Sequence, residues 1–322
     1  MRTHLLRIAV VAGLAALEAI RQPISLLLLT TMALAAVILP LVTSHTLGES
    51  ERMMADTTLA LHLFIGMLLG GFTACHSLTG EIRRGTAATV LSKPVSRAAF
   101  YLGKFVGLAL VLLSFSLAAT ACSLIATRAV AEPYAVDWRA LGPLLVGLIG
   151  AYAGAGAMNF FTRRPFVSDA YRLVVIASLA AFLIAGCFDR DGQWQAFGAG
   201  YLWPLATASL LVALAIGLLA ALSLALAARF DVVPTVTICG TVLLLGMMSD
   251  YLFGRQAATS PLAAALYAVL PNWQHFWMAD ALHQGDAIPL RYVAEVAVYA
   301  AAYLLGLLGL GMFAFSHTEV KA

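Results

Sequence analysis

The stretch TGEIRRGTAATVLSKPVSRAAFYLGK, residues 79–104, is a polar interruption between two long apolar runs. It contains one acidic residue, Glu81, against five basic residues. The basic residues are Arg83, Arg84, Lys93, Arg97 and Lys104. An excess of positive charge beside apolar spans marks the cytoplasmic side of a membrane. We therefore predict that this segment joins two membrane helices on the cytoplasmic side.

Glycine and proline divide the segment. Gly85 can end the incoming helix, and Pro94 disfavours helical geometry in the residue before it. Between them there is room for about two helical turns, roughly residues 86–91. Ser96 is a suitable N-cap for the outgoing helix. The pattern predicts a short helix lying across the end of a helical hairpin, and an ordinary solvated loop is the alternative.

The composition excludes a soluble globular protein. Of the 322 residues 62% are hydrophobic and 11% are charged, and the mean hydropathy is +0.92. Soluble domains are about 45–50% apolar. The net charge of +3 gives no support to nucleic-acid binding. We predict an all-α, polytopic helical membrane protein with a single transmembrane domain over residues 1–322.

Eight apolar runs are candidate transmembrane helices, and most reach the roughly 20 residues that a bilayer requires. They are residues 24–42, 58–78, 100–127, 141–161, 173–187, 202–228, 233–253 and 292–315. Because the fifth run is short, six full spans plus re-entrant elements are the alternative. Residues 255–291 are apolar but broken by Pro271, which predicts an external, partly re-entrant segment. Trp273 and Trp277 are expected at the headgroup level.

The charge distribution predicts the orientation. A cytoplasmic N-terminus places residues 1–21, 79–104, 162–172, 229–231 and 316–322 inside. Thirteen basic residues then lie inside and six outside, whereas the acids divide five to eleven. This agrees with the positive-inside rule, and the opposite orientation violates it at nearly every hairpin. Both termini are predicted to be cytoplasmic.

The N-terminal residues 1–21 resemble a signal peptide in charge but lack a convincing A-x-A cleavage site, so we expect them in the mature protein. His4, Arg7, Glu18 and Arg21 fall within about one 100° arc of a helix. This pattern predicts an amphipathic helix in the membrane interface.

Motifs for enzymatic chemistry are missing from the sequence. Gly80 and Gly85 have the spacing of a phosphate-binding loop, but Thr86 stands where that motif needs lysine. There is no HExxH, no GxSxG and no cysteine pair spaced for a metal. We therefore predict no catalytic residues, no metal site and no ATP binding by this chain.

Polar residues within the apolar runs are few. His62 and His76 lie about 21 Å apart on one helix, which suits separate polar contacts better than a shared ligand. Glu295 is the one charged residue we assign to a span interior, and Arg291 four residues earlier is its expected partner. The apolar runs therefore show no internal relay of ionisable residues. Three GxxxG pairs are candidates for close helix contacts, including a dimer interface: Gly66 and Gly70, Gly103 and Gly107, and Gly150 and Gly154.

The residues of the opening segment resemble the pattern E...GT....LS.PVSR..F..GK of ABC-2-type (type V) ABC transporter permeases. The matching positions are Glu81, Gly85, Thr86, Leu91, Ser92, Pro94, Val95, Ser96, Arg97, Phe100, Gly103 and Lys104. The resemblance implies that residues 79–104 are a coupling segment that docks on an ATPase. The contact residues that it implies are Glu81, Arg83, Arg84, Gly85, Thr86, Leu91, Ser92, Lys93, Pro94 and Arg97.

The same resemblance extends to an interfacial elbow helix at residues 1–21 and to the Leu-Pro-Asn run at residues 270–272. It implies a homodimeric exporter in the bacterial inner membrane, with two copies of a cytoplasmic ATPase that bind ATP and Mg, and with no cofactor in this chain. The permeases of nitrous-oxide-reductase maturation and gliding motility are the branch most similar. An ion-coupled secondary transporter and a non-transporting membrane scaffold or signalling subunit are the alternatives. The sequence leaves the substrate open.

Overall fold

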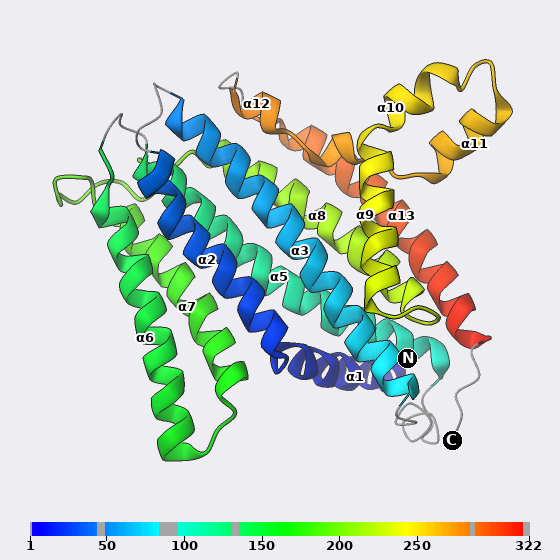
Figure 1. Ribbon diagram of the computed structural model, residues 1–322, viewed down its shortest axis with the longest axis horizontal. Helices are drawn as coiled ribbons and strands as arrows, with labels where there is room; N and C mark the ends of the chain where they lie inside the picture. Colours follow the sequence, from blue (N-terminus) through cyan, green and yellow to red (C-terminus); the bar gives the residue numbers. More distant parts are fainter. Residues whose placement is uncertain (1, 44–48, 84–95, 131–134, 284–286, 318–322) are drawn as a thin grey trace.

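The computed structural model describes residues 2–43, 49–83, 96–130, 135–283 and 287–317, and within them almost all regular structure is helical (Figure 1). The longer helices are α1 (Arg2–Ile20), α2 (Pro23–Thr43), α3 (Ser50–Arg83), α5 (Arg97–Ala129), α6 (Trp138–Thr162), α7 (Phe166–Cys187), α8 (Trp203–Leu226), α9 (Val232–Met247) and α13 (Leu290–Ser316). The shorter ones are α10 (Ser249–Leu252), α11 (Pro261–Val269), α12 (Ala279–His283) and the 3-10 turns η1 (Gly254–Gln256) and η2 (Trp273–Phe276).

Seven of the described helices are long and apolar enough to cross a membrane, namely α2, α3, α5, α6, α7, α8 and α13. Helix α9 continues into residues 249–256 through a bend of 65°, and this bent pair makes an eighth candidate. The prediction of an all-α polytopic membrane protein with about eight spans is confirmed. The expected continuous seventh span is wrong, because the helix breaks after Met247.

The fifth span is longer than predicted. Helix α7 begins at Phe166, seven residues before the expected start, and it includes Asp169 and Arg172. These two side chains pair one turn apart on the helix, with Arg172 Nη1 3.3 Å from Asp169 Oδ1. Arg164, in the preceding turn, lies 3.4 Å from the other carboxylate oxygen. Hydropathy alone excluded this first turn from the span because the mutual pairing of its charges was not visible.

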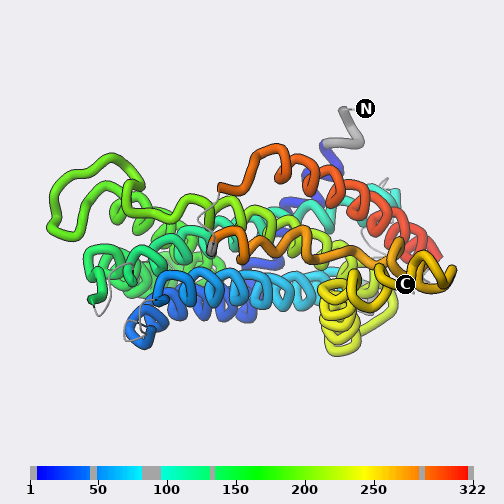
Figure 2. Tube along the Cα trace, turned by 90° about the horizontal axis from the view of Figure 1, so that it is seen from above, coloured from blue at the N-terminus to red at the C-terminus, as the bar shows by residue number. Residues whose placement is uncertain are grey.

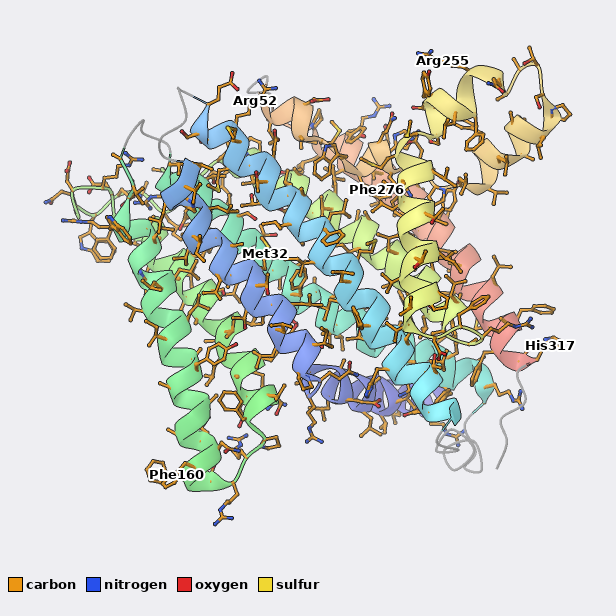
Figure 3. The ribbon with its side chains drawn as sticks, viewed as in Figure 1. Met32, Arg52, Phe160, Arg255, Phe276 and His317 are labelled. Carbon is orange, nitrogen blue, oxygen red and sulfur yellow. The ribbon has the colours of Figure 1, made fainter. Side chains whose placement is uncertain are left out.

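The helices alternate in direction between two ends of the molecule (Figure 1). Helix α1 lies across one end, which we call the α1 end, and α2, α5, α7 and α9 leave from it. Helices α3, α6, α8 and α13 return to it, so the turns from α6 to α7 and from α8 to α9 are there too. Figure 3 shows Phe160 and His317 toward this end and Arg52 and Arg255 at the opposite, far end.

Helices α3, α5 and α8 form the centre of the molecule, and most of each is buried. From above, α9 lies on the α3 side of α8 and α13 on the other side (Figure 2). Helices α6 and α13 are peripheral and expose large apolar side chains, such as Val146 and Leu305. Exposed apolar side chains on long helices are what contact with lipid chains requires. Met32, midway along α2, is buried (Figure 3).

The glycines of the three GxxxG pairs differ in their contacts within the chain. A Cβ added at Gly70 would lie 3.3 Å from the Cβ of Ala220 on α8. Gly103 and Gly107 on α5 face α1. A Cβ added at Gly150 would have no neighbour within 4 Å among the described residues, whereas one added at Gly154 would lie 3.5 Å from Leu173 of α7.

The predicted polar contacts of the spans had mixed outcomes. The ion pair between Arg291 Nε and Glu295 Oε1 is confirmed at 2.9 Å. His76 lies 3.8 Å from Glu18, in agreement with a polar role. His62 is fully buried with its ring edge against Phe115, and neither ring nitrogen has a hydrogen-bond partner among the described residues, so the expected polar contact is wrong.

Residues 249–283 form a chain of short helices at the far end (Figure 1). Asn272 organises it, because its amide nitrogen Nδ2 donates to Asp250 Oδ1 and its backbone N–H donates to the Tyr299 hydroxyl. Tyr267 also donates to Asp250 Oδ1 at 2.7 Å, and this hydrogen bond raises the pKa of the Tyr267 phenol. Trp273 is buried against the protein, and its ring N–H donates to the Val242 carbonyl.

Candidate functional site

Three helices meet at a buried lysine at the α1 end. Lys104 Nζ on α5 lies 2.7 Å from Glu81 Oε1 on α3 and 3.2 Å from Glu18 Oε2 on α1. His76 Nδ1, on α3, lies 3.8 Å from the remaining oxygen of Glu18. We call these four residues the Lys104 cluster. It joins the elbow helix to the two helices that bracket the segment at residues 84–95.

Lys104 is only 4% exposed, although it belongs to the segment predicted to be a polar connection. Its ammonium group also lies 5.7 Å from the centre of the Phe100 ring. A buried ammonium group is tolerated when carboxylates and hydrogen bonds replace its water. The expectation that Glu295 is the one charged residue within a span is wrong. The predicted runs 100–127 and 233–253 themselves contain Lys104 and Asp250, and α7 adds Asp169 and Arg172.

The predicted cap at the start of α5 is confirmed. The Ser96 side chain accepts a hydrogen bond from the Ala99 N–H at 3.2 Å, and its backbone is extended, as at an N-cap. The next residue, Arg97, donates from Nη1 to the Ser316 carbonyl at 2.6 Å. This contact joins the beginning of α5 to the last residue of α13.

The end of α3 is tied in a similar way. The Thr79 hydroxyl donates to the Ala227 carbonyl at 2.7 Å and lies 3.3 Å from the Phe230 carbonyl, in the turn between α8 and α9. The two helix ends that bracket residues 84–95 are therefore attached to α1, to α13 and to the α8–α9 turn. Through these contacts, a displacement of this segment would move several membrane helices directly.

Close packing of α1 on α5 brings Glu18 to Lys104. A Cβ at Gly107 would lie 2.5 Å from the Ala12 carbonyl oxygen and 2.7 Å from the Ala15 Cβ. At Gly103 it would lie 2.7 Å from Val11. Real Cβ atoms do not approach other atoms this closely, so both positions require glycine. Gly103 and Gly107 thus form the surface of α5 on which the elbow helix α1 packs.

We expect Gly107→Ala to displace α1 and to destabilise the protein by about 1–3 kcal/mol, because the added methyl group overlaps the backbone of α1. Thermal unfolding in detergent measures the change. Gly150→Ala is the matched control, since it adds the same methyl group to a membrane helix where nothing lies within 4 Å. Equal unfolding midpoints for the two variants would contradict the close packing of α1 on Gly107.

The structure places part of the predicted docking set. Glu81 lies in the Lys104 cluster and Arg97 at the start of α5. The remaining residues of the set lie outside the described residues or, for Arg83, have a side chain outside them. They are Arg83, Arg84, Gly85, Thr86, Leu91, Ser92, Lys93 and Pro94.

The four polar residues predicted for the elbow do not form one group. Glu18 joins the Lys104 cluster, while Arg21 follows the end of α1 and is exposed. Arg7 is half-buried on α1, and the side chain of His4 is outside the described part. The outward face of α1 is apolar instead, formed by Leu6, Val10, Leu14 and Leu17.

A second buried ion pair, which sequence reasoning missed, lies at the far end. Arg128 near the end of α5 is 4% exposed, and its Nε is 3.3 Å from Oδ2 of Asp137, whose carboxylate is 2% exposed. Asp137 is also the N-cap of α6, accepting from the Arg139 N–H at 2.9 Å. Arg128 donates to the carbonyls of Ala185 and Phe188. The pair therefore links α5, α6 and the end of α7.

Tyr201, in the connection before α8, covers this pair. Its ring lies 5.8 Å from the Arg128 guanidinium, and its hydroxyl donates to the Phe182 carbonyl at 2.6 Å. Burial raises the pKa of the Tyr201 phenol, although nearby Arg128 acts in the opposite direction. Arg128 and Asp137 flank a short loop nine residues apart, and that spacing was the available sequence signal.

The described residues contain no group of three or more histidine, cysteine, aspartate or glutamate side chains arranged to hold a metal ion. The Lys104 cluster has two carboxylates, but a lysine ammonium occupies the space between them. The arrangement is suited to holding α1, α3 and α5 together rather than to catalysis.

Comparison with known families gives one match. Residues 20–168 match the model for the ABC-2 family transporter protein, a range that runs from the end of α1 into α7 and includes the Lys104 cluster except Glu18. No match was found among curated proteins. Members of the ABC-2 permease family normally lack ATPase motifs and work with a partner ATPase. Residues 20–168, slightly less than half of the chain, are thus similar to the ABC-2 family transporter protein, and the chain has the seven to eight candidate spans of a multi-pass membrane protein.

Proposed function

We propose that this chain is the permease subunit of an ATP-driven exporter, and that residues 79–104 dock on a separate cytoplasmic ATPase. The observation that carries the proposal is the attachment of both ends of residues 84–95. Glu81 and Lys104 tie them to α1, Thr79 ties them to the α8–α9 turn, and Arg97 ties them to α13. A docking segment needs such attachments to transmit force.

The location of the buried charges favours transport that is driven by ATP hydrolysis in a partner subunit rather than by an ion gradient. Among the described residues, the buried ion pairs lie toward the ends of the helices, at Lys104 and Asp169 near the α1 end and at Arg128 and Asp137 near the far end. An ion-coupled transporter usually needs ionisable groups within the membrane interior. This arrangement supports the ATP-driven permease over the secondary transporter.

The orientation follows from charge. The α1 end contains the segments in which thirteen of the nineteen basic residues lie, so we place it in the cytosol of a bacterial inner membrane. We further propose a homodimer with two ATPase copies, which bind ATP and Mg while this chain binds neither. The Pro-Val-Ser-Arg and Leu-Pro-Asn runs favour the branch of nitrous-oxide-reductase maturation and gliding-motility permeases.

The decisive variant is the double substitution Arg83→Glu and Arg84→Glu. If the segment docks on an acidic site of the ATPase, reversing both charges should weaken the complex at least about tenfold, or about 1.4 kcal/mol. Co-purification of the ATPase and substrate-dependent ATP hydrolysis measure the effect. The experiment also tests the orientation, because a cytosolic ATPase reaches this segment only from that side.

Arg163→Glu with Arg164→Glu is the matched control, with the same charge reversal at the α6–α7 turn of the same end. We expect a smaller loss of ATPase binding there. A docking variant that inserts normally, recruits its ATPase with unchanged affinity and transports at the original rate would disprove the proposal.

A further inference from the structure

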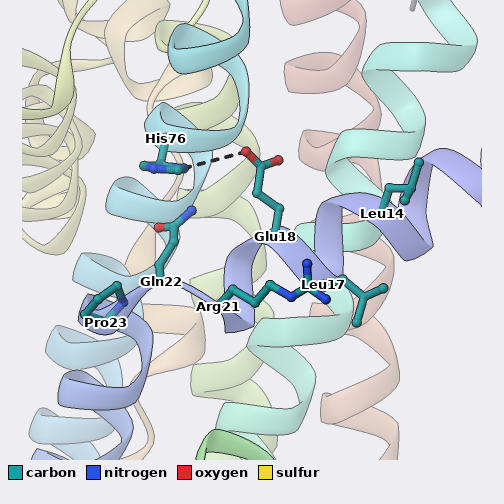
Figure 4. Close-up of a pocket in the computed structure, with 7 residues that line it drawn as sticks. All are labelled: Leu14, Leu17, Glu18, Arg21, Gln22, Pro23 and His76. Atoms are coloured by element: carbon teal, nitrogen blue, oxygen red, sulfur yellow. Dashed lines mark ion pairs between the residues drawn. The ribbon is translucent and has the colours of Figure 1, made fainter. Parts of the chain in front are cut away.

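A polar pocket lies at the corner where α1 turns into α2 (Figure 4). Its volume is about 370 Å³. The residues that line it are Leu14, Leu17, Glu18, Arg21, Gln22, Pro23 and His76. The pocket therefore combines an acid, a base, an amide and an imidazole with three apolar side chains, at the level where α1 crosses the ends of the spans.

Gln22 supplies a buried hydrogen-bond donor to the pocket. This side chain is only 7% exposed, and its amide nitrogen Nε2 has no hydrogen-bond partner among the described residues. Figure 4 shows the carboxamide extending toward His76 and Glu18. A buried amide without a partner is unfavourable, because it has lost its bonds to water. An acceptor that enters the pocket would remove this penalty.

Glu18 offers the complementary group. Its Oε2 is occupied by Lys104, whereas its Oε1 lies 3.8 Å from His76 Nδ1. That separation is compatible with an ion pair but too long for a hydrogen bond. Oε1 can therefore accept a hydrogen bond from a donor in the pocket. Arg21, exposed at the rim, adds a positively charged donor beside the neutral amide of Gln22.

The apolar neighbours of the pocket point to an amphiphilic ligand. Leu6, Val10, Leu14 and Leu17 form the exposed face of α1, and the last two also line the pocket. An exposed leucine face on a helix that crosses the ends of membrane spans contacts acyl chains. A molecule lying along this face therefore places its polar headgroup at Gln22 and Glu18.

We propose that the pocket binds the headgroup of a phospholipid that has both a phosphate and a primary ammonium group, as phosphatidylethanolamine does. The phosphate accepts from Gln22 Nε2 and Arg21, and the ammonium group donates to Glu18 Oε1. The bound lipid stabilises the elbow between α1 and α2. This site goes beyond the transport function and does not depend on it.

The test is thermal unfolding of the full, delipidated protein in detergent after addition of phosphatidylethanolamine, phosphatidylcholine or phosphatidylglycerol with identical acyl chains. At one hundred times its Kd, phosphatidylethanolamine should raise Tm by about 4 °C. Phosphatidylcholine should raise it less, because its quaternary ammonium has no N–H donor. Gln22→Leu should remove most of the shift, whereas Gln256→Leu, which changes an exposed glutamine of η1, should retain it.

Equal shifts with the three lipids, or a larger shift with phosphatidylglycerol, would overturn the assignment of the headgroup. An equal shift with soluble glycerophosphoethanolamine would show that the ligand need not be a lipid and would overturn that part. If Gln22→Leu fails to fold, the exposed Arg21→Met replaces it, and native mass spectrometry of the unaltered protein counts bound lipid. A preference for phosphatidylethanolamine over phosphatidylcholine is expected there, and its absence contradicts the proposal.

Discussion

Replacing Arg128 with methionine is expected to destabilise the protein by about 3 kcal/mol or more, since Asp137 then remains as a buried carboxylate without its main partner. Two carbonyls, those of Ala185 and Phe188, also lose their donor. Arg190 lies 3.9 Å from the same carboxylate oxygen and replaces part of the attraction. Unfolding in detergent measures the change, and limited proteolysis of the α7–α8 connection should show faster cleavage.

Arg190→Met is the matched control at the far end. This arginine is partly exposed and more distant from Asp137, so its loss should cost less than about 1 kcal/mol. Asp137→Asn combined with Arg128→Met should cost less than Arg128→Met alone, because it removes the uncompensated charge while asparagine still caps α6. An Arg128→Met protein with unchanged stability and cleavage would show that the pair is not structural.

Lys104→Met is the second substitution for which we expect a large effect. It leaves Glu18 and Glu81 facing each other without the ammonium group between them. Since both carboxylates are partly exposed, the cost should lie near the lower limit for a broken buried pair, about 3 kcal/mol. That corresponds to a fall in Tm on the order of 5 °C. On the proposed function, ATP hydrolysis should also lose its coupling to transport.

Two further variants separate the charge effect from lost packing. Combining Lys104→Met with Glu18→Gln and Glu81→Gln removes the repulsion and should recover most of the stability. Arg291→Met breaks an ion pair of similar length on α13, but that arginine is 90% exposed, so the loss should stay below about 1 kcal/mol. The interpretation fails if Lys104→Met and Arg291→Met have the same Tm.

Local sequence signals predicted much of the fold. The apolar run 24–42 became α2, Pro23–Thr43, and the run 292–315 became α13, Leu290–Ser316. Ser96 caps α5 as expected, because capping depends on residues three positions apart. The Gly103 and Gly107 pair was recognised from its spacing, but its partner α1 was not.

Local signals failed where charges pair. The predicted start of the fifth span was too late because Asp169 and Arg172 were treated as loop residues. In the structure they form an ion pair on one helix. The break after Met247 was also not predicted, because Ser249 and Asp250 were included in the expected span 233–253. Most of the predicted docking residues stay a prediction, because residues 84–95 lie outside the described ranges.

The sequence by itself determined the class of protein, the number and approximate limits of the spans and the basic character of residues 79–104, because hydropathy, span length and local charge act within single segments. Only the tertiary structure decided which charges meet. Lys104 reaches Glu81 across 23 residues and Glu18 across 86. These contacts exist because Gly103 and Gly107 let α1 approach the backbone of α5, and no property of either helix alone specifies that approach.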